Sequence, residues 1–243
     1  MARFLIGIDD TDNLESRGTG YRARQLGALL YEAGIDPLGI TRHQLLVDPR
    51  IPYTSHNSSA CLEVECRHTR GELVEICREF LLQESAPGSD AGLCVAERPQ
   101  ANADVVAFGR KAKQDIVAAA DAHALAETRA IHLEGLTGTR IGVIGALAGV
   151  GLRAAGDDGR YLWMPGLREQ QGIVGADRIL ALGVDGIETE DGRIAGAGDR
   201  IDVGGWPRPL PRGGRAVLLV EPSESAECEW RVLPKTRIKE LSG

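Results

Sequence analysis

Three carboxylates lie within four residues near the start of the chain, at Asp9, Asp10 and Asp12. Like charges this close repel one another unless cations or backbone N–H groups offset them. Magnesium prefers oxygen ligands and is commonly held by one or two carboxylates together with nucleotide phosphates and water. We therefore predict that these aspartates bind Mg²⁺ and act in catalysis. An aspartate-rich turn held by its own hydrogen bonds is the alternative.

The apolar run from Phe4 to Ile8 ends at these carboxylates and is typical of a buried β-strand. Ligands of open α/β sheets bind beyond the carboxyl ends of strands, so this position favours a binding role.

The segment Arg17-Gly18-Thr19-Gly20 leads into a helix predicted over Tyr21 to Ala33. Glycine lets a ligand approach the backbone closely, and a helix N-terminus offers unpaired N–H groups. Gly18, Thr19 and Gly20, together with Thr11, are therefore predicted to contact nucleotide phosphates, with Thr19 also a catalytic contact or transient phosphate acceptor. Simple capping of the helix by Thr19 is the alternative.

A long polar segment from Asp48 to Ser59 is predicted to meet the acceptor substrate. Its cationic and hydrogen-bonding side chains suit an anion, a sugar or a base, and the candidates are Arg50, Tyr53, His56 and Asn57. A solvated loop is the alternative.

Lys111 lies on a helix predicted to begin at Asn102, in a chain where lysine is scarce. A cation there would neutralise the charge that develops during phosphoryl transfer. A solvated helical face is the alternative. The chain has no Gly-x-x-x-x-Gly-Lys-Ser/Thr motif, so an ordinary P-loop is excluded.

These motifs, in this order, resemble those of archaeal isoleucine-tRNA 2-agmatinylcytidine synthetase over about residues 4–170. Thr19 falls on the threonine that becomes phosphorylated in that family. The other matching segments are Ile6 to Asn13, Ile51 to Asn57, Lys111 to Asp115 and Gly142 to Gly151.

The resemblance implies a kinase-like domain joined to a ferredoxin-like unit. It also implies ATP-dependent activation of a cytidine C2 oxygen, which agmatine then displaces. The chain departs from the family at Gly18 and Gly20, which replace a cysteine and a second threonine, and residues 54–59 lose basic charge. The family's OB fold and zinc ribbon have no counterpart. ATP chemistry is therefore expected to carry over better than tRNA recognition.

The composition is that of a soluble globular protein, with 243 residues, 43% apolar and 26% charged residues and a net charge of −7. The five cysteines form no Cys-x-x-Cys pair, and no signal peptide or membrane span is recognisable, which favours a cytoplasmic protein. The expected fold class is α/β (α+β). We expect a kinase-like domain at 1–165, with a ferredoxin-like unit around 60–100, and a small β-rich module at 166–243.

The sequence thus predicts an ATP- and Mg²⁺-dependent enzyme that activates a carbonyl or hydroxyl oxygen of a small-molecule acceptor by phosphoryl or nucleotidyl transfer. One alternative is a tRNA cytidine-modifying synthetase that recruits RNA through Arg208, Arg212, Arg215 and 235–239. Another is a nucleotide sensor without turnover. The identity of the acceptor and the oligomeric state stay open.

Overall fold

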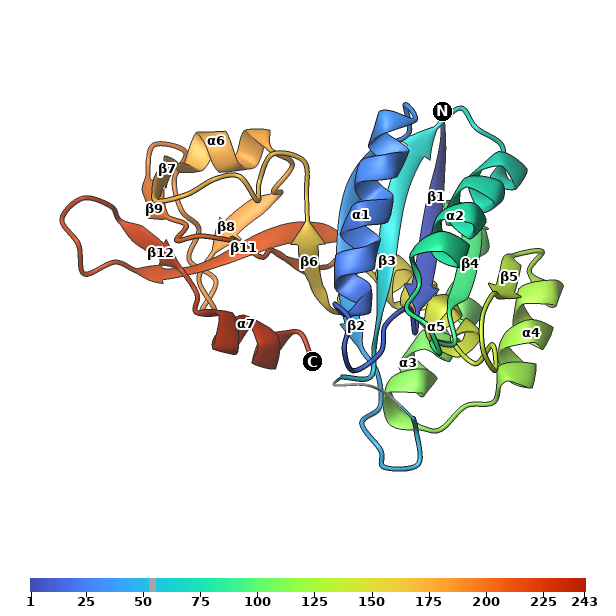
Figure 1. The fold of residues 1–243 in the computed structure, drawn as a ribbon. Coiled ribbons are helices and arrows are strands. Elements are labelled where there is room, and N and C mark those ends of the chain that lie inside the picture. Colours follow the sequence, from blue (N-terminus) through green and yellow to red (C-terminus); the bar gives the residue numbers. More distant parts are fainter. Residues whose placement is uncertain (53–55) are drawn as a thin grey trace. The chain divides into compact units, whose positions relative to one another are not determined.

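The computed structural model describes residues 1–52 and 56–243, which form two compact units, Met1–Ala155 and Gly156–Gly243 (Figure 1). The sequence placed the division after residue 165, whereas the structure divides the chain after Ala155. The last helix of the first unit ends at Ala155, and Gly156 then adopts a φ of +75°, which glycine reaches without strain.

The first unit is built on an antiparallel sheet. Along the sheet its strands follow the order β5-β4-β1-β3-β2, and every neighbouring pair is antiparallel. The strands are β1 (Ala2–Asp9), β2 (Asp36–Gln44), β3 (Ser58–Cys66), β4 (Gly92–Glu97) and β5 (His132–Gly135). The strand that ends in the aspartate cluster is therefore central, with partners on both sides.

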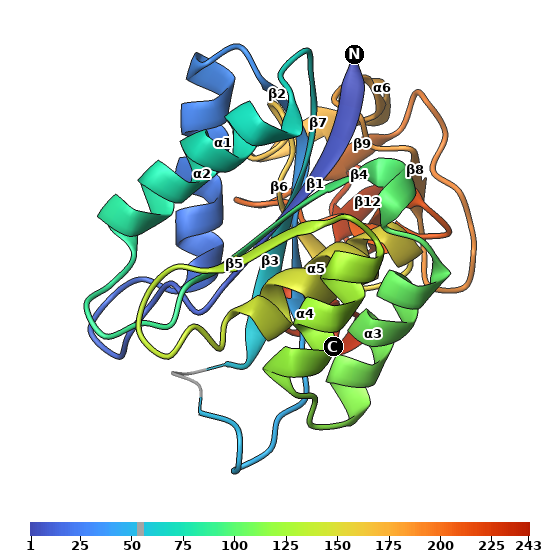
Figure 2. The ribbon, with the colours of Figure 1, turned by 90° about the vertical axis from the view of Figure 1, so that its right-hand side faces the viewer.

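Helices cover both faces of this sheet (Figure 2). On one face lie α1 (Thr19–Glu32) and α2 (Arg70–Glu84), and on the other lie α3 (Ala103–Gln114), α4 (Ala119–Thr128) and α5 (Val143–Ala155). Alternate residues of β1 point to opposite faces. Leu5 belongs to the core cluster beneath α5, and a Cβ on Gly7 would lie 2.0 Å from the carbonyl oxygen of Ala146. The same alternation directs Asp9 toward α5.

The order β1-α1-β2-β3-α2-β4, with the strands arranged β4-β1-β3-β2, is the ferredoxin-like arrangement. It spans residues 2–97, so the prediction that this unit lies around 60–100 was too short. The aspartate-bearing strand belongs to the ferredoxin-like unit itself. Because the sheet is antiparallel, the argument from parallel-strand ends does not apply to it.

Local capping signals in the sequence mark the starts of two helices. The capping box between Thr69 and Glu72 is present at the start of α2. Asn102, where the sequence predicts a helix to begin, caps α3, and this helix ends at Gln114. Helix α4 was not predicted, because its alanine-rich segment has little apolar periodicity.

The second unit is β-rich. Its sheet follows the order β10-β11-β12-β9-β7, and β8 pairs with β11 in parallel. Its elements are β6 (Arg160–Trp163), β7 (Ile173–Gly175), α6 (Ala176–Ala181), β8 (Gly186–Glu188), β9 (Arg200–Asp202), β10 (Leu210–Arg212), β11 (Arg215–Pro222), β12 (Trp230–Val232) and α7 (Lys235–Leu241). A turn forms at Asp191-Gly192, with an antiparallel bridge between Glu188 and Ile194 and a φ of +87° at Gly192.

Within residues 1–52 and 56–243, no helix is long and apolar enough to cross a membrane.

Candidate functional site

A cavity in the first unit collects most of the residues that the sequence singles out. It lies where the end of β1, the start of α1, residues 45–52 and 56–58, the end of α3 and the start of α5 come together. The predicted site residues among its lining are Asp9, Asp10, Asp12, Thr19, Arg50, His56 and Asn57. The rest of the lining is Leu45, Ile51, Pro52, Ser58, Ala112, Asp115, Ile116, Val117, Ile141, Gly142, Ile144 and Gly145.

Asp9 is the carboxylate that packs against α5. A Cβ on Gly145 would lie only 1.7 Å from its Oδ2 atom, so the close approach requires glycine at that helix position. Burial, with a smaller contribution from Asp10, raises the pKa of Asp9 from 3.8 to about 8. A half-buried carboxylate of this kind, poorly solvated in its cavity, would be stabilised in its charged form by a cation.

Asp10 follows in a left-handed conformation, with a φ of +51°, which is uncommon for a residue with a side chain. Such backbone conformations cluster at functional sites. Burial, followed by the charge of Asp90 and then that of Asp12, raises the pKa of Asp10 to about 6.

Asp90 is a neighbouring carboxylate that sequence reasoning missed. It precedes β4, whose antiparallel register places Gly92 opposite Asp9. The antiparallel pairing of β1 with β4 therefore brings the beginning of β4 beside the end of β1. An acidic residue just before a buried strand was the available signal, but the pairing partner could not be read from one sequence.

Asp12 is held by the start of α1. Its Oδ1 atom accepts hydrogen bonds from the Thr19 hydroxyl at 2.8 Å and from the Thr19 backbone N–H at 3.1 Å. The hydroxyl of Thr11 in turn donates to the Thr19 hydroxyl at 3.2 Å. The N-cap residue is Gly18, and no side chain caps the helix from that position. The capping alternative for Thr19 is therefore wrong, and the Thr19 hydroxyl orients a carboxylate.

The described residues contain no group of three His, Cys, Asp or Glu side chains close enough to hold a metal ion. Of the three aspartates predicted to bind Mg²⁺, Asp12 is engaged by hydrogen bonds from Thr19. Asp9 and Asp10 offer the hard oxygen donors that suit Mg²⁺, which often uses one or two carboxylates with phosphates and water. The residues present therefore fit Mg²⁺ in company with a nucleotide, rather than a metal held by protein alone.

Two of the residues predicted to meet the acceptor, Arg50 and Asn57, form hydrogen bonds within the chain. The Arg50 guanidinium forms two 2.8 Å hydrogen bonds with Asp48, which lower the pKa of Asp48 to about 2. The Asn57 amide donates to the Leu46 carbonyl oxygen at 2.7 Å and so helps to shape the segment itself. His56 is exposed at the cavity lining. Tyr53 lies outside the described residues.

The structure does not bring every predicted residue to the cavity. Lys111 is exposed and lines a separate depression with Arg110, because its neighbour Ala112 faces the core and the cavity. Thr11, Gly18 and Gly20 are absent from the lining of the cavity within the described chain, although Thr11 supports Thr19 from behind.

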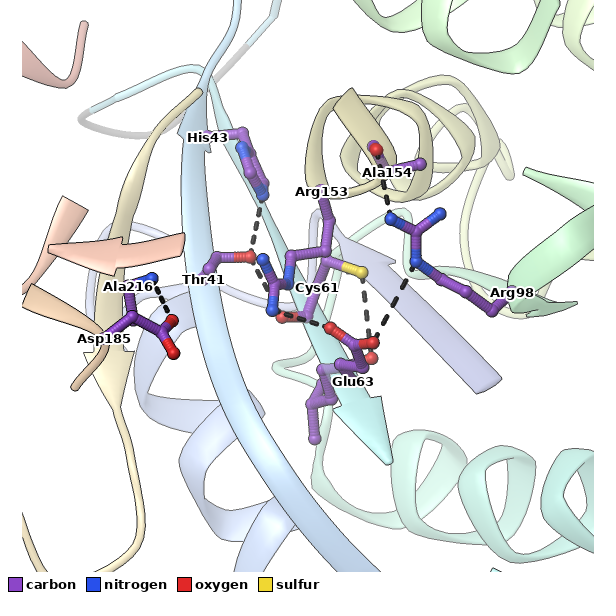
Figure 3. Close-up of polar contacts among 10 residues, drawn as sticks. Thr41, His43, Cys61, Glu63, Arg98, Arg153, Ala154, Asp185 and Ala216 are labelled. Atoms are coloured by element: carbon purple, nitrogen blue, oxygen red, sulfur yellow. Dashed lines mark hydrogen bonds and ion pairs between the residues drawn. The ribbon is translucent and has the colours of Figure 1, made fainter. Parts of the chain in front are cut away.

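A buried polar cluster fixes α5 to the sheet (Figure 3). Arg153, near the end of α5, forms a 2.6 Å ion pair with Glu63 of β3, and the Arg98 guanidinium lies 3.9 Å from the same carboxylate. On β2, the Thr41 hydroxyl and the His43 Nε2 atom are 2.8 Å apart. Removing one partner of such a buried ion pair lowers the free energy of unfolding, because it leaves the other charge unpaired. The cluster therefore anchors the helix whose other end touches Asp9.

We expect the stability of the metal-free protein to fall as the pH rises. The unfolded chain releases the Asp9 proton near the ordinary pKa of 3.8, whereas the folded protein keeps it up to about 8. Between these values the folded state holds the extra proton, so unfolding becomes easier as the pH increases and the effect levels off above 8. Thermal melts in a chelating buffer should show a shallower pH dependence for Asp9→Asn than for the wild type; parallel pH profiles would contradict this.

Comparisons with solved structures show that the chain is similar to part of the enzyme TiaS and of a tRNA labeling enzyme. One is the crystal structure of apo TiaS, an agmatidine synthetase acting on an isoleucine tRNA, with 25% identity and a TM-score of 0.54, covering 61% of this chain and 35% of that chain. Another is the complex of TiaS with that tRNA and ATP, with 26% identity and a TM-score of 0.55, covering 62% of this chain and 36% of that chain. A tRNA fluorescent labeling enzyme is similar at 26% identity and a TM-score of 0.55, covering 61% and 36%.

The resemblance expected from the motifs is confirmed by this likeness to TiaS. The chain spans about 35% of the length of the apo TiaS structure that it resembles. No protein-family model matches the chain, and no curated protein matches it.

Proposed function

We propose that this protein is an ATP- and Mg²⁺-dependent enzyme that activates an oxygen atom of its acceptor by phosphoryl or nucleotidyl transfer. The observation that carries the proposal is the cavity in which Asp9 and Asp10 lie beside the Asp12–Thr19 pair. Support also comes from the similar TiaS structure, which contains ATP and tRNA. In the proposed reaction the acceptor oxygen bonds to a phosphorus atom of ATP, and ADP or pyrophosphate leaves.

In this proposal Asp9 and Asp10 hold Mg²⁺ against the nucleotide phosphates. The bound Mg²⁺ would neutralise phosphate charge as the transfer proceeds. Thr19 is the first residue of α1 and lines the cavity, so the positive end of the helix dipole lies there. That positive end favours the binding of an anion. Asp12 keeps the Thr19 hydroxyl fixed in orientation, which limits the reorganisation needed during the reaction.

The lining of the cavity combines polar and apolar side chains, and the proposal assigns them different partners. Apolar side chains, including Leu45, Val117 and Ile144, line part of it and suit the face of a nucleobase. We assign His56 and Asn57 to the acceptor side, together with Arg50 once it exchanges Asp48 for a ligand. Lys111 is not part of the proposed machinery.

Calorimetric titration of the wild-type protein with ATP tests the proposal. We expect saturable binding in Mg²⁺ and much weaker binding in a chelating buffer, because the two half-buried carboxylates of Asp9 and Asp10 repel uncompensated phosphates. Equal affinity in the two buffers would contradict a role for the metal.

A tRNA cytidine-modifying synthetase is the second candidate, favoured by the likeness to the complex of TiaS with tRNA and ATP. Consumption of ATP that depends on added tRNA would select it over a small-molecule acceptor. A nucleotide sensor would bind Mg²⁺–ATP and consume none with either acceptor.

Replacing Thr19 by alanine should lower ATP turnover by more than about tenfold, whereas Thr19→Ser should retain much of it. Alanine removes the hydroxyl that donates to Asp12 at 2.8 Å but keeps the backbone N–H contact. Turnover and thermal melting should be measured together on the three proteins. Wild-type turnover in Thr19→Ala would remove Thr19 from the site.

A further inference from the structure

Trp206 in the second unit stacks with two arginines. The guanidinium carbon of Arg168 lies 3.9 Å from the centre of the indole ring, and that of Arg208 lies 4.1 Å from it. Both guanidinium groups therefore stack on the same indole ring. The three side chains, called the Arg168–Trp206–Arg208 stack below, are all half-buried.

The backbone holds this stack in place. The segment that carries Trp206 is tied to the rest of the unit by hydrogen bonds between Val203 and Gly172, at 2.9 Å, and between Gly172 and Gly204, at 3.1 Å. The Arg208 guanidinium donates to the Trp206 carbonyl oxygen at 3.2 Å. Arg168 follows the buried residue Leu167. The cations are therefore ordered before any ligand arrives, which reduces the entropy cost of binding.

The charges of the stack have no carboxylate partner in the described part of the chain, unlike those of five other arginines in this unit. Elsewhere in this unit Arg193, Arg200, Arg215, Arg231 and Arg237 all form ion pairs with carboxylates. Within the described residues, neither Arg168 nor Arg208 has a carboxylate partner. Burial, together with the nearby charge of Arg168, lowers the pKa of Arg208. Two like charges held together in this way attract an anion.

We propose that the Arg168–Trp206–Arg208 stack binds the phosphate backbone of an RNA acceptor. Guanidinium groups form two-pronged hydrogen bonds with phosphate, and stacking on an aromatic ring fixes their orientation. This inference rests on the second candidate function, in which tRNA is the acceptor, and deepens it by assigning a phosphate-contact site to the second unit. The second unit has more acidic than basic residues, so the stack contributes to RNA binding by the full chain and does not make this unit a strong RNA binder alone.

The test is fluorescence anisotropy of the full chain with labelled bulk tRNA over a salt series. We expect Arg168→Gln/Arg208→Gln to weaken binding on the order of tenfold at about 0.05 M salt, and to reduce the salt slope by about two, close to one per lost phosphate contact. Trp206→Leu should weaken binding while leaving the slope nearly unchanged, because both cations remain.

The matched control is Arg200→Gln/Arg231→Gln, which removes the same charge from two exposed, carboxylate-paired arginines of the same unit. Equal losses in the two double variants would overturn the proposal, because they would show general electrostatic attraction. Stack-dependent binding of polyglutamate as tight as that of tRNA would also overturn it, in favour of an acidic protein. Mg²⁺–ATP affinity should be unchanged in the stack variant, so failure of nucleotide binding in the wild type would reject the proposed function separately.

Discussion

Asp10→Asn should weaken the Mg²⁺-dependent binding of ATP by about ten- to a hundredfold, the cost of losing one charge-assisted contact. The substitution keeps the shape of the side chain and removes the charge that a cation needs. In a chelating buffer Asp10→Asn should bind ATP more tightly than the wild type does, because the variant repels phosphates less. Calorimetric titration in the two buffers measures both effects.

The same variant should melt at a temperature no lower than that of the metal-free wild type near neutral pH. Burial raises the pKa of Asp10 to about 6, so its charged form costs folding free energy that the neutral amide avoids. Loss of binding without loss of stability separates a functional role from a structural one. Asp36→Asn, on the exposed start of β2, is the matched control and should change neither property. Unchanged Mg²⁺–ATP affinity in Asp10→Asn would reject its role.

Gly145→Ala should abolish nucleotide binding although it improves the intrinsic helix propensity of α5 by about 1 kcal/mol. The new Cβ would lie 1.7 Å from Oδ2 and 2.4 Å from Cγ of Asp9, so the carboxylate must leave its position. We expect Mg²⁺–ATP affinity to fall below detection by calorimetry, and the melting temperature to fall as well.

A second substitution distinguishes displacement of the Asp9 carboxylate from general misfolding. Asp9→Ala removes the clashing carboxylate, so the double variant Asp9→Ala/Gly145→Ala should melt at a higher temperature than Gly145→Ala alone while remaining unable to bind Mg²⁺–ATP. Gly71→Ala is the control, because a Cβ at that position in α2 would have its nearest neighbour, Thr69 Oγ1, at 3.9 Å. Wild-type binding by Gly145→Ala would show that Asp9 is not needed where the structure places it.

The parts of the site that lie close together in the sequence could be predicted without a structure. Asp9, Asp10, Asp12 and Thr19 occupy one short stretch, and the apolar run before them predicts where the strand ends. Their meeting in one cavity follows from local chain geometry. The polar segment that contains His56 also reaches that cavity.

The parts that depend on long-range register could not be predicted. Asp90 reaches Asp10 only because β4 pairs with β1, and Gly145 reaches Asp9 only because α5 packs on that face of the sheet. Lys111 was predicted to reach the site but does not. Its neighbour on α3, Ala112, lines the cavity, whereas Lys111 lines a different depression. A one-residue step turns a helix by about 100°, which composition and spacing cannot resolve without a known packing partner.

The most direct test of the proposed site is a crystal structure of the protein with a non-hydrolysable ATP analogue and Mg²⁺. We predict that the phosphates and the metal lie against Asp9 and Asp10, with the Thr19 hydroxyl still bound to Asp12. An analogue bound instead at the depression of Arg110 and Lys111, with the aspartates unoccupied by metal, would contradict it.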